Sequence, residues 1–91
     1  MLEIRHNEIK QAYEAFVDGR FAGTCEYEES ANVITFTHTL VQPEFKGKGI
    51  GSALAKFVLE ESRLQGKQVV ADCQFISAYI KKNAEFASLT R

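Results

Sequence analysis

Three glycines at alternate positions mark the middle of the chain, in the stretch VQPEFKGKGIGSAL that covers residues 41–54. They are Gly47, Gly49 and Gly51, and Lys46 and Lys48 stand beside them. A glycine-rich turn before a helix exposes backbone N–H groups without intrahelical partners, and the helix dipole adds partial positive charge there. The stretch therefore indicates a site for a phosphate or pyrophosphate, with a tight turn that merely needs glycine as the alternative.

The segments before this loop indicate strands. Four of them are rich in β-branched and aromatic residues: residues 2–6, 11–17, 21–29 and 33–41. The polar connections at residues 18–20 and 30–32 are short enough for hairpins. Pro43 ends the fourth strand, because it has no N–H to give to a ladder. We therefore expect an antiparallel meander ahead of the loop.

The apolar period changes to that of a helix at Ile50, and Gly66 provides a stop. One face of this helix is predicted to carry Ile50, Leu54, Phe57 and Leu64, flanked by Ala53 and Val58. Residues 67–73 are predicted to form a buried strand and residues 74–83 a second helix, while residues 84–91 are left unassigned. The second helix is predicted to turn four residues inward: Phe75, Ile76, Tyr79 and Ile80.

This order predicts an α/β (α+β) fold with a mixed, mainly antiparallel sheet. The four-strand meander is followed by a helix, a strand parallel to the fourth and a final helix, with a right-handed crossover between the parallel strands. A chain of 91 residues can bury one modest core, so we expect residues 1–91 to form a single domain.

Three kinds of phosphate-binding loop are candidates for the glycine stretch. A Walker loop is excluded, because no Gly-Lys-Ser or Gly-Lys-Thr closes it. A dinucleotide fingerprint fits Gly47 and Gly49 with Ser52 in third place, and Asp72 follows roughly 20 residues later, where a ribose carboxylate belongs. However, a dinucleotide site needs further parallel strands, and few residues remain after Asp72. The third kind is a loop that binds the pyrophosphate of an acyl-CoA.

The loop and its flanks resemble the signature of the GNAT superfamily of N-acetyltransferases. The signature Q/R-x-x-G-x-G/A is matched from Lys46 to Gly51, and a Val-x-Pro precedes it at Val41 to Pro43. The chain is similar over nearly its full length to the short single-domain branch of that superfamily. That branch carries a His before the Val-x-Pro, matched by His38, and a Cys at the end of the next strand, matched by Cys73.

An aromatic residue and a Tyr follow that Cys in the branch, and here they are Phe75 and Tyr79. The chain departs from the pattern in three places. Lys46 stands where Arg or Gln is usual, Gln74 where Pro often follows the Cys, and Ala84 where Pro often precedes an acidic–aromatic pair. A lysine keeps the charge of the loop, whereas the other two changes affect helix ends near Cys73.

The resemblance implies an acetyl-CoA-dependent N-acetyltransferase whose cofactor is acetyl-CoA or coenzyme A and whose acceptor is an unidentified amine. It implies that the pyrophosphate lies on the loop residues Lys46, Gly47, Lys48, Gly49, Ile50, Gly51 and Ser52. It also implies that the pantetheine arm pairs with the backbone of the fourth strand, at Thr39, Leu40 and Val41. Tyr79 is placed to reach either the cofactor or the core.

His38 is the best general base that the chain offers, because an imidazole titrates near neutral pH; the alternative is a strand histidine satisfied by hydrogen bonds. Cys73, at the carboxyl end of a parallel strand and the start of a helix, has a placement that favours a thiolate. It is predicted to lie near the thioester, as a covalent acceptor of the acetyl group or as the proton donor to the CoA thiolate, with an inert buried thiol as the alternative. Cys25 is expected to be structural, and His6 to lie on the surface.

The overall composition limits the classes of partner that the protein is expected to bind. The net charge is −1, so the sequence is not basic enough to suggest a nucleic-acid partner. No apolar stretch is long enough to suggest a membrane span. We therefore expect neither partner and a cytoplasmic location. The two cysteines suggest neither a metal site nor a disulfide framework. Acidic residues of the meander could attract a cationic amine: Glu14, Glu26, Glu28 and Glu29. A second hypothesis is a module of the same fold that binds CoA or acyl-CoA without turnover. The oligomeric state is not readable.

Overall fold

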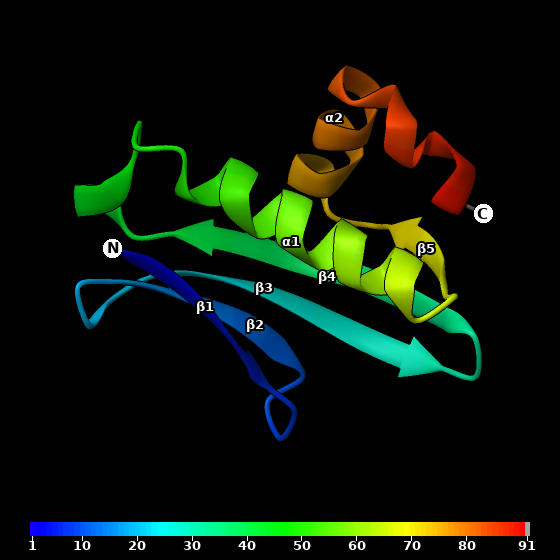
Figure 1. Ribbon diagram of the computed structural model, residues 1–91, viewed down its shortest axis with the longest axis horizontal. Helices are drawn as coiled ribbons and strands as arrows, with labels where there is room; N and C mark the ends of the chain where they lie inside the picture. Colours follow the sequence, from blue (N-terminus) through cyan, green and yellow to red (C-terminus); the bar gives the residue numbers. More distant parts are fainter. Residues whose placement is uncertain (91) are drawn as a thin grey trace.

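The structure is a computed structural model that describes residues 1–90. One five-stranded sheet in the order β1-β2-β3-β4-β5 is packed against two α-helices (Figure 1). The elements are β1 Leu2–Asn7, β2 Ala12–Val17, β3 Arg20–Ser30, β4 Val33–Val41, the 3₁₀ helix η1 Pro43–Phe45, α1 Ile50–Leu64, β5 Gln68–Ala71, α2 Gln74–Lys82 and the 3₁₀ helix η2 Ala84–Leu89.

The first four strands pair antiparallel in sequence order, and β5 is parallel to β4. The predicted mixed α/β architecture is therefore confirmed. The β2–β3 turn has Asp18 at φ 50° and Gly19 at φ 82°, the two positive values that a tight hairpin turn requires. Of residues 84–91, which the sequence left unassigned, Ala84–Leu89 form η2 and residue 91 lies outside the described residues. β5 ends at Ala71, two residues before its predicted end.

The edge of the sheet opens between β4 and β5. Only residues Val33–Phe36 of β4 pair with β5, and the last hydrogen bond across this edge runs from the Cys73 N–H to the Phe36 carbonyl, at 3.0 Å. Beyond Phe36, β4 continues to Val41 while the chain after β5 turns away into α2 (Figure 1). A length of β4 backbone is thus left without a neighbour on this side.

A β-bulge lies in β4 at the start of that free length. The β3–β4 register passes from Tyr27↔Phe36 to Glu26↔His38, so Thr37 has no residue opposite it. The extra residue changes which backbone groups point toward β3. Bulges bend and twist a strand, and this one lies where β4 leaves β5.

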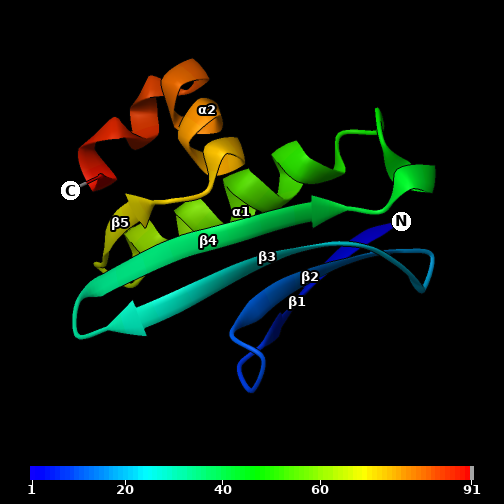
Figure 2. The same ribbon diagram turned by 180° about the vertical axis from the view of Figure 1, so that it is seen from behind.

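The core lies between one face of the sheet and α1. Fully buried side chains of β3, β4, β5, both α-helices and η2 meet there, among them Cys25, Phe36, Leu54, Leu59, Val69, Ile76 and Phe86. Seen from behind, β3 and β4 lie in front of α1, and no helix of residues 1–90 covers their other face (Figure 2). The helices therefore leave one face of the sheet open.

Two predicted core positions are wrong. Leu64 is 81% exposed, because the buried face of α1 is centred on Ala55, Leu59 and Ser62 and Leu64 projects to the other side. Phe75 is 39% exposed because it lies in the first turn of α2, over the start of α1 instead of in the core. Ile76 and Ile80 are buried as predicted, and Tyr79 is half-buried.

Candidate cofactor site at the opening of the sheet

The glycine loop lies between η1 and α1. Phe45, the last residue of η1, is buried and fixes the start of the loop against the core. Gly47 and Gly49 follow with φ of 79° and 77°, and a Cβ on either would touch nothing within 4 Å. The left-handed backbone, and not the space around it, therefore requires glycine at these two positions.

The N-terminus of α1 faces a cavity. Gly49 is the residue that precedes the helix, and the first intrahelical bond there is from the Ala53 N–H to the Gly49 carbonyl, at 3.0 Å. The N–H groups of the first turn precede that bond and have no intrahelical partner. The cavity has a volume of about 270 Å³ and is lined by Val41, Phe45, Lys46, Gly47, Gly49, Ile50, Gly51, Ser52 and Phe75. Most of the residues predicted to hold a pyrophosphate thus surround one hollow.

Phe75 is a lining residue that the sequence reasoning placed in the core. A Cβ on Gly51 would lie 2.5 Å from the Phe75 Cζ, so the ring rests directly on the glycine backbone. Phe75 and Ser52 also line a second, smaller cavity of about 110 Å³, together with Tyr79. The Phe75 ring therefore separates two neighbouring hollows, and the glycine at position 51 makes room for it.

Arg20 is another residue that the sequence reasoning missed. It lies at the start of β3, far from the loop in sequence, yet its guanidinium is 5.4 Å from the centre of the Phe45 ring and pairs with Glu44. The Lys48 ammonium lies 5.9 Å from the centre of the same Phe45 ring. Lys46 is exposed and lines the cavity. Several cations thus gather around η1 and the loop, as a polyanion requires. Arg20 reaches the loop through the pairing of β3 with β4, which the local sequence does not show.

The free edge of β4 leads away from this cavity. The Gln42 N–H donates to the Ala22 carbonyl at 2.8 Å, and Gly23 lies opposite Val41. The alternation of an antiparallel ladder then turns the backbone groups of Val41 and Thr39 toward the free edge, and those of Leu40 toward β3. Leu40 has a side chain that is 57% exposed. Of the three strand residues predicted to pair with a pantetheine, Thr39 and Val41 have the orientation for it.

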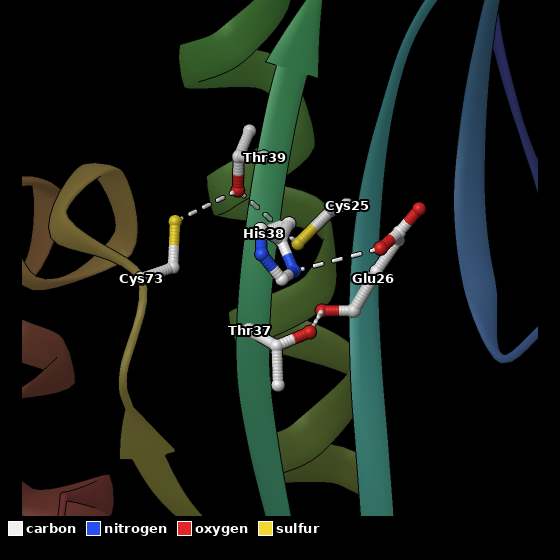
Figure 3. Close-up of polar contacts among 6 residues, drawn as sticks. All are labelled: Cys25, Glu26, Thr37, His38, Thr39 and Cys73. Carbon is white, nitrogen blue, oxygen red and sulfur yellow. Dashed lines mark hydrogen bonds and ion pairs between the residues drawn. The ribbon is translucent and has the colours of Figure 1, made fainter.

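Cys73 lies at the other end of this free edge. It is the residue that precedes α2, it is 7% exposed, and its carbonyl accepts the Ser77 N–H at 3.0 Å. Its thiol donates to the Thr39 Oγ1 at 3.3 Å (Figure 3). The thiol is thus held against β4 at the point where the strand has left β5.

His38 lies next to Thr39 but on the uncovered face of the sheet. Its side chain is 78% exposed, and its Nδ1 is 3.6 Å from the Glu26 Oε1 on the neighbouring strand (Figure 3). The two residues are cross-strand partners and share one face. The structure therefore brings His38 and Cys73 to the same stretch of β4, one on the strand face and one at its edge.

The other predicted residues lie apart from this stretch. The Tyr79 ring is 6.1 Å from that of Phe86, so it contacts both the core and the smaller cavity. His6 is exposed as predicted, but its Nε2 is also 2.6 Å from the Tyr27 hydroxyl and its ring stacks on Tyr13 at 4.2 Å. Cys25 is fully buried, and burial raises the pKa of its thiol to about 12.

The acidic residues of the meander do not form one group. Lys67 pairs with Glu29, and Glu26 faces His38. Glu14 accepts a hydrogen bond from the Asn7 amide at 3.5 Å, between β2 and β1. Within residues 1–90 no set of three His, Cys, Asp or Glu is arranged to hold a metal ion, and none of the helices there has the length and apolarity to cross a membrane.

The glycine loop, the cavity at the start of α1 and the unpaired edge of β4 thus adjoin one another. Comparison with known proteins gives the family. The profile of a family described as GCN5-related N-acetyl-transferase matches residues 12–89. The chain belongs to this family of N-acetyltransferase domains, and the resemblance to the GNAT superfamily is confirmed. A search of curated proteins returns no match.

Solved structures show the same fold. A GCN5-like protein from Staphylococcus aureus, solved by NMR, matches with a TM-score of 0.77 at 24% identity, over 99% of this chain and 88% of that one. A ribosomal-protein-alanine N-acetyltransferase from Brucella melitensis biovar Abortus matches with a TM-score of 0.63 at 22% identity, over 68% of this chain and 49% of its own.

The PaiA N-acetyltransferase from Thermoplasma acidophilum, solved in complex with coenzyme A, matches with a TM-score of 0.56 at 25% identity. The match covers 60% of this chain and 35% of that one. This chain thus spans most of the Staphylococcus protein, but half or less of the two larger enzymes.

Proposed function

We propose that this chain is an acetyl-CoA-dependent N-acetyltransferase that acts on an amine. The observation that carries the proposal is the continuity of the free edge of β4. At one end Val41 lines the cavity at the start of α1, and at the other end Thr39 contacts the Cys73 thiol. A ligand with phosphates at one end and a reactive thioester at the other fits such a site, and coenzyme A has this form.

The cofactor would be held mainly by backbone groups. The first-turn N–H groups of α1 and the loop around Gly47 and Gly49 would bind the pyrophosphate, and Lys46, Lys48 and Arg20 would add charge. Thr39 and Val41 would pair with the pantetheine amides along the free edge. The Phe75 ring would have to share or leave the space above Gly51 when the ligand binds, because it lines the same cavity.

The chemistry would use the two side chains beside Thr39. Bound acetyl-CoA would supply an acetyl thioester at the opening of the sheet. An ammonium acceptor loses two protons on becoming an amide, so His38 would take one and release it to solvent. Cys73 would donate a proton to the sulfur that leaves as the C–N bond forms and the C–S bond breaks, and would regain a proton from the amine or from solvent.

Calorimetry on two matched glycine variants tests the cofactor site. Gly49→Ala and Gly66→Ala both place a side chain at a left-handed position with nothing within 4 Å, one at the start of α1 and the other after its end. We expect Gly49→Ala to weaken CoA binding at least about tenfold, since the N–H groups of the loop lose their alignment. Gly66→Ala should lose similar stability but keep its affinity for CoA. Binding of NAD without binding of CoA would overturn the proposal.

A second function, binding of acyl-CoA without turnover, is supported by one feature. His38 lies on an exposed face and lines none of the cavities described for residues 1–90. None of these three cavities therefore offers an acceptor an enclosed pocket beside the base. Incubation of the CoA-binding protein with acetyl-CoA and a panel of primary amines separates the two functions, because only an enzyme releases CoA faster with an amine present.

Intact-mass measurement after incubation with acetyl-CoA tests the role of Cys73. An unchanged mass agrees with the proton-donor role. A gain of one acetyl group that Cys73→Ala abolishes would instead make Cys73 the covalent acceptor. The cytoplasmic location and the lack of nucleic-acid and membrane partners stay predictions.

A further inference from the structure

The Thr39 side chain links the two cysteines of the chain. Its Oγ1 accepts a hydrogen bond from the Cys73 thiol at 3.3 Å and donates one to the Cys25 sulfur at 3.6 Å (Figure 3). The three residues come from α2's start, β4 and β3, so the tertiary fold alone brings them together. One hydroxyl thus lies between a thiol at the proposed site and a thiol that the proposed reaction does not use.

Cys25 is suited to a fixed, neutral role in this chain of hydrogen bonds. It is 0% exposed, and burial raises the pKa of its thiol to about 12, against the opposing effect of the Thr39 hydrogen bond. It therefore keeps its proton over the whole working range of an enzyme. A thiol can both accept and donate a weak hydrogen bond, so Cys25 can serve Thr39 in either direction.

The charged side chains next to Cys25, Thr39 and Cys73 in sequence do not lie among these three residues. Glu26 follows Cys25 and His38 precedes Thr39, both on the uncovered face, and Asp72 precedes Cys73 on an exposed turn. The buried residues of α1, which packs over the sheet here, are all uncharged. From α2 only the helix N-terminus faces the Cys73 thiol, because Cys73 is the residue that precedes it. Within residues 1–90, the hydrogen bond of the Cys73 thiol is to the Thr39 hydroxyl.

We propose that Thr39 is a positioning residue whose hydroxyl reverses its hydrogen bonds when Cys73 loses its proton, with Cys25 as the partner that permits the reversal. In the resting protein the donors run from Cys73 to Thr39 to Cys25. After Cys73 gives up its proton, the Thr39 O–H turns to donate to the Cys73 thiolate and the Cys25 S–H turns to donate to Thr39. Each remaining proton stays on its own heavy atom, and only two bonds rotate.

The reversal would matter at the step in which Cys73 gives its proton to the departing CoA sulfur. A hydrogen bond to the charged form stabilises it, so Thr39 would hold the thiolate until a proton returns. This use rests on the proposed function, whereas the reversal itself can be observed in the free protein. Its failure and the failure of the proposed function are therefore distinguishable.

The experiment is an NMR titration of protein labelled with ¹³C at the Cβ of cysteine, without CoA. The two signals are assigned with Cys25→Ala and Cys73→Ala. In the wild-type protein we expect the Cys25 signal to shift with the same pH midpoint as Cys73, because the Thr39 hydroxyl leaves Cys25 when Cys73 ionises. Cys25 itself remains protonated through that interval.

Two Thr39 variants separate the hydroxyl from its surroundings. Thr39→Val keeps the branched shape but removes the hydroxyl, and should abolish the linked shift of Cys25. Thr39→Ser keeps the hydroxyl and should retain the linked shift. A Cys25 signal that follows Cys73 equally in Thr39→Val would show through-space coupling and overturn the proposal. So would a wild-type Cys25 signal that ignores Cys73, which decides the matter even if a variant fails to fold.

Discussion

His38 owes its position to one unpaired residue, Thr37. The bulge at Thr37 resets the alternation of β4, so that Thr39 faces the core and Cys25 while His38 emerges on the open face opposite Glu26. An exposed imidazole with a carboxylate 3.6 Å from its Nδ1 has its other nitrogen free for a substrate proton. The chemistry proposed for His38 therefore belongs to the uncovered face, and that of Cys73 to the edge.

Replacement of His38 tests this division at the scale of the residue. We expect His38→Gln to lower kcat for acetyl transfer by about 100-fold, the usual minimum contribution of a general base, with the Kd for CoA unchanged. Steady-state kinetics with a reactive amine and calorimetry with CoA measure the two quantities.

The other histidine provides the matched control. His6→Gln removes a hydrogen bond to Tyr27 but lies away from β4's free edge, so kcat should stay near that of the wild type. Equal loss of kcat in both variants would show that the substitution acts through stability and not through the base. Equal kcat in His38→Gln and wild type would remove His38 from the mechanism.

Among the elements, those with strong local signals were predictable and those that depend on pairing were not. The period-2 and helical patterns, the turn at Asp18–Gly19 and the glycine loop all express local preferences, and the structure has each of them. The bulge at Thr37 leaves no local mark, because it arises from how β3 and β4 align. The same holds for Arg20 beside the loop and for the face of α1, which buries Ser62 and leaves Leu64 exposed.

Gly51 illustrates this limit within the site. The sequence suggested that it gives a phosphate access to the backbone, but in the structure the nearest group to a would-be Cβ is the Phe75 ring, at 2.5 Å. Gly51 has no positive φ to satisfy, unlike Gly47 and Gly49. In this structure it therefore lets the start of α2 pack on the start of α1, at the wall of the cavity.

A double-mutant cycle tests this contact between elements. Alanine is favoured over glycine within a helix by about 1 kcal/mol, so Gly51→Ala should stabilise the protein where nothing opposes it. We expect Gly51→Ala to lower the free energy of unfolding in the wild type, because the Phe75 ring must move, and to raise it in a Phe75→Leu background. Urea unfolding of the four proteins gives the coupling. Equal effects of Gly51→Ala in both backgrounds would contradict the packing described.

In the molecule as a whole, the proposed cofactor site lies beside the covered face of the sheet and the proposed base lies on the open face. Both α-helices lie over the covered face (Figures 1 and 2). The cavity lies at the start of α1, and His38 faces Glu26 on the uncovered face. Both faces can be reached from the free edge of β4, because within residues 1–90 no strand pairs with this edge beyond Phe36. A cofactor at this edge and an acceptor over the open face would meet without passing through the core.

Two buried groups of the covered face, Cys25 and Tyr13, make the stability of the fold depend on pH above 9. Burial raises the pKa of Cys25 from 9.0 to about 12 and that of Tyr13 from 10.0 to about 12. Both groups favour the neutral form in the folded state. Their stabilisation is therefore complete below pH 9, and it is lost as the pH rises toward 12, because the unfolded chain ionises first.

Urea unfolding followed by circular dichroism from pH 7.5 to 11 tests this expectation. Above pH 9 the free energy of unfolding should fall, with each group contributing up to about 1.4 kcal/mol per pH unit. Cys25→Ala should be less stable at pH 7.5 but lose stability more slowly between pH 9 and 10, since Tyr13 begins to contribute only near its ordinary value of 10.0. Tyr13→Phe should differ in slope only above pH 10. If Cys25→Ala and the wild type fall in parallel over pH 9–10, the buried thiol cannot be the source, and its role as a permanently neutral partner of Thr39 would fail with it.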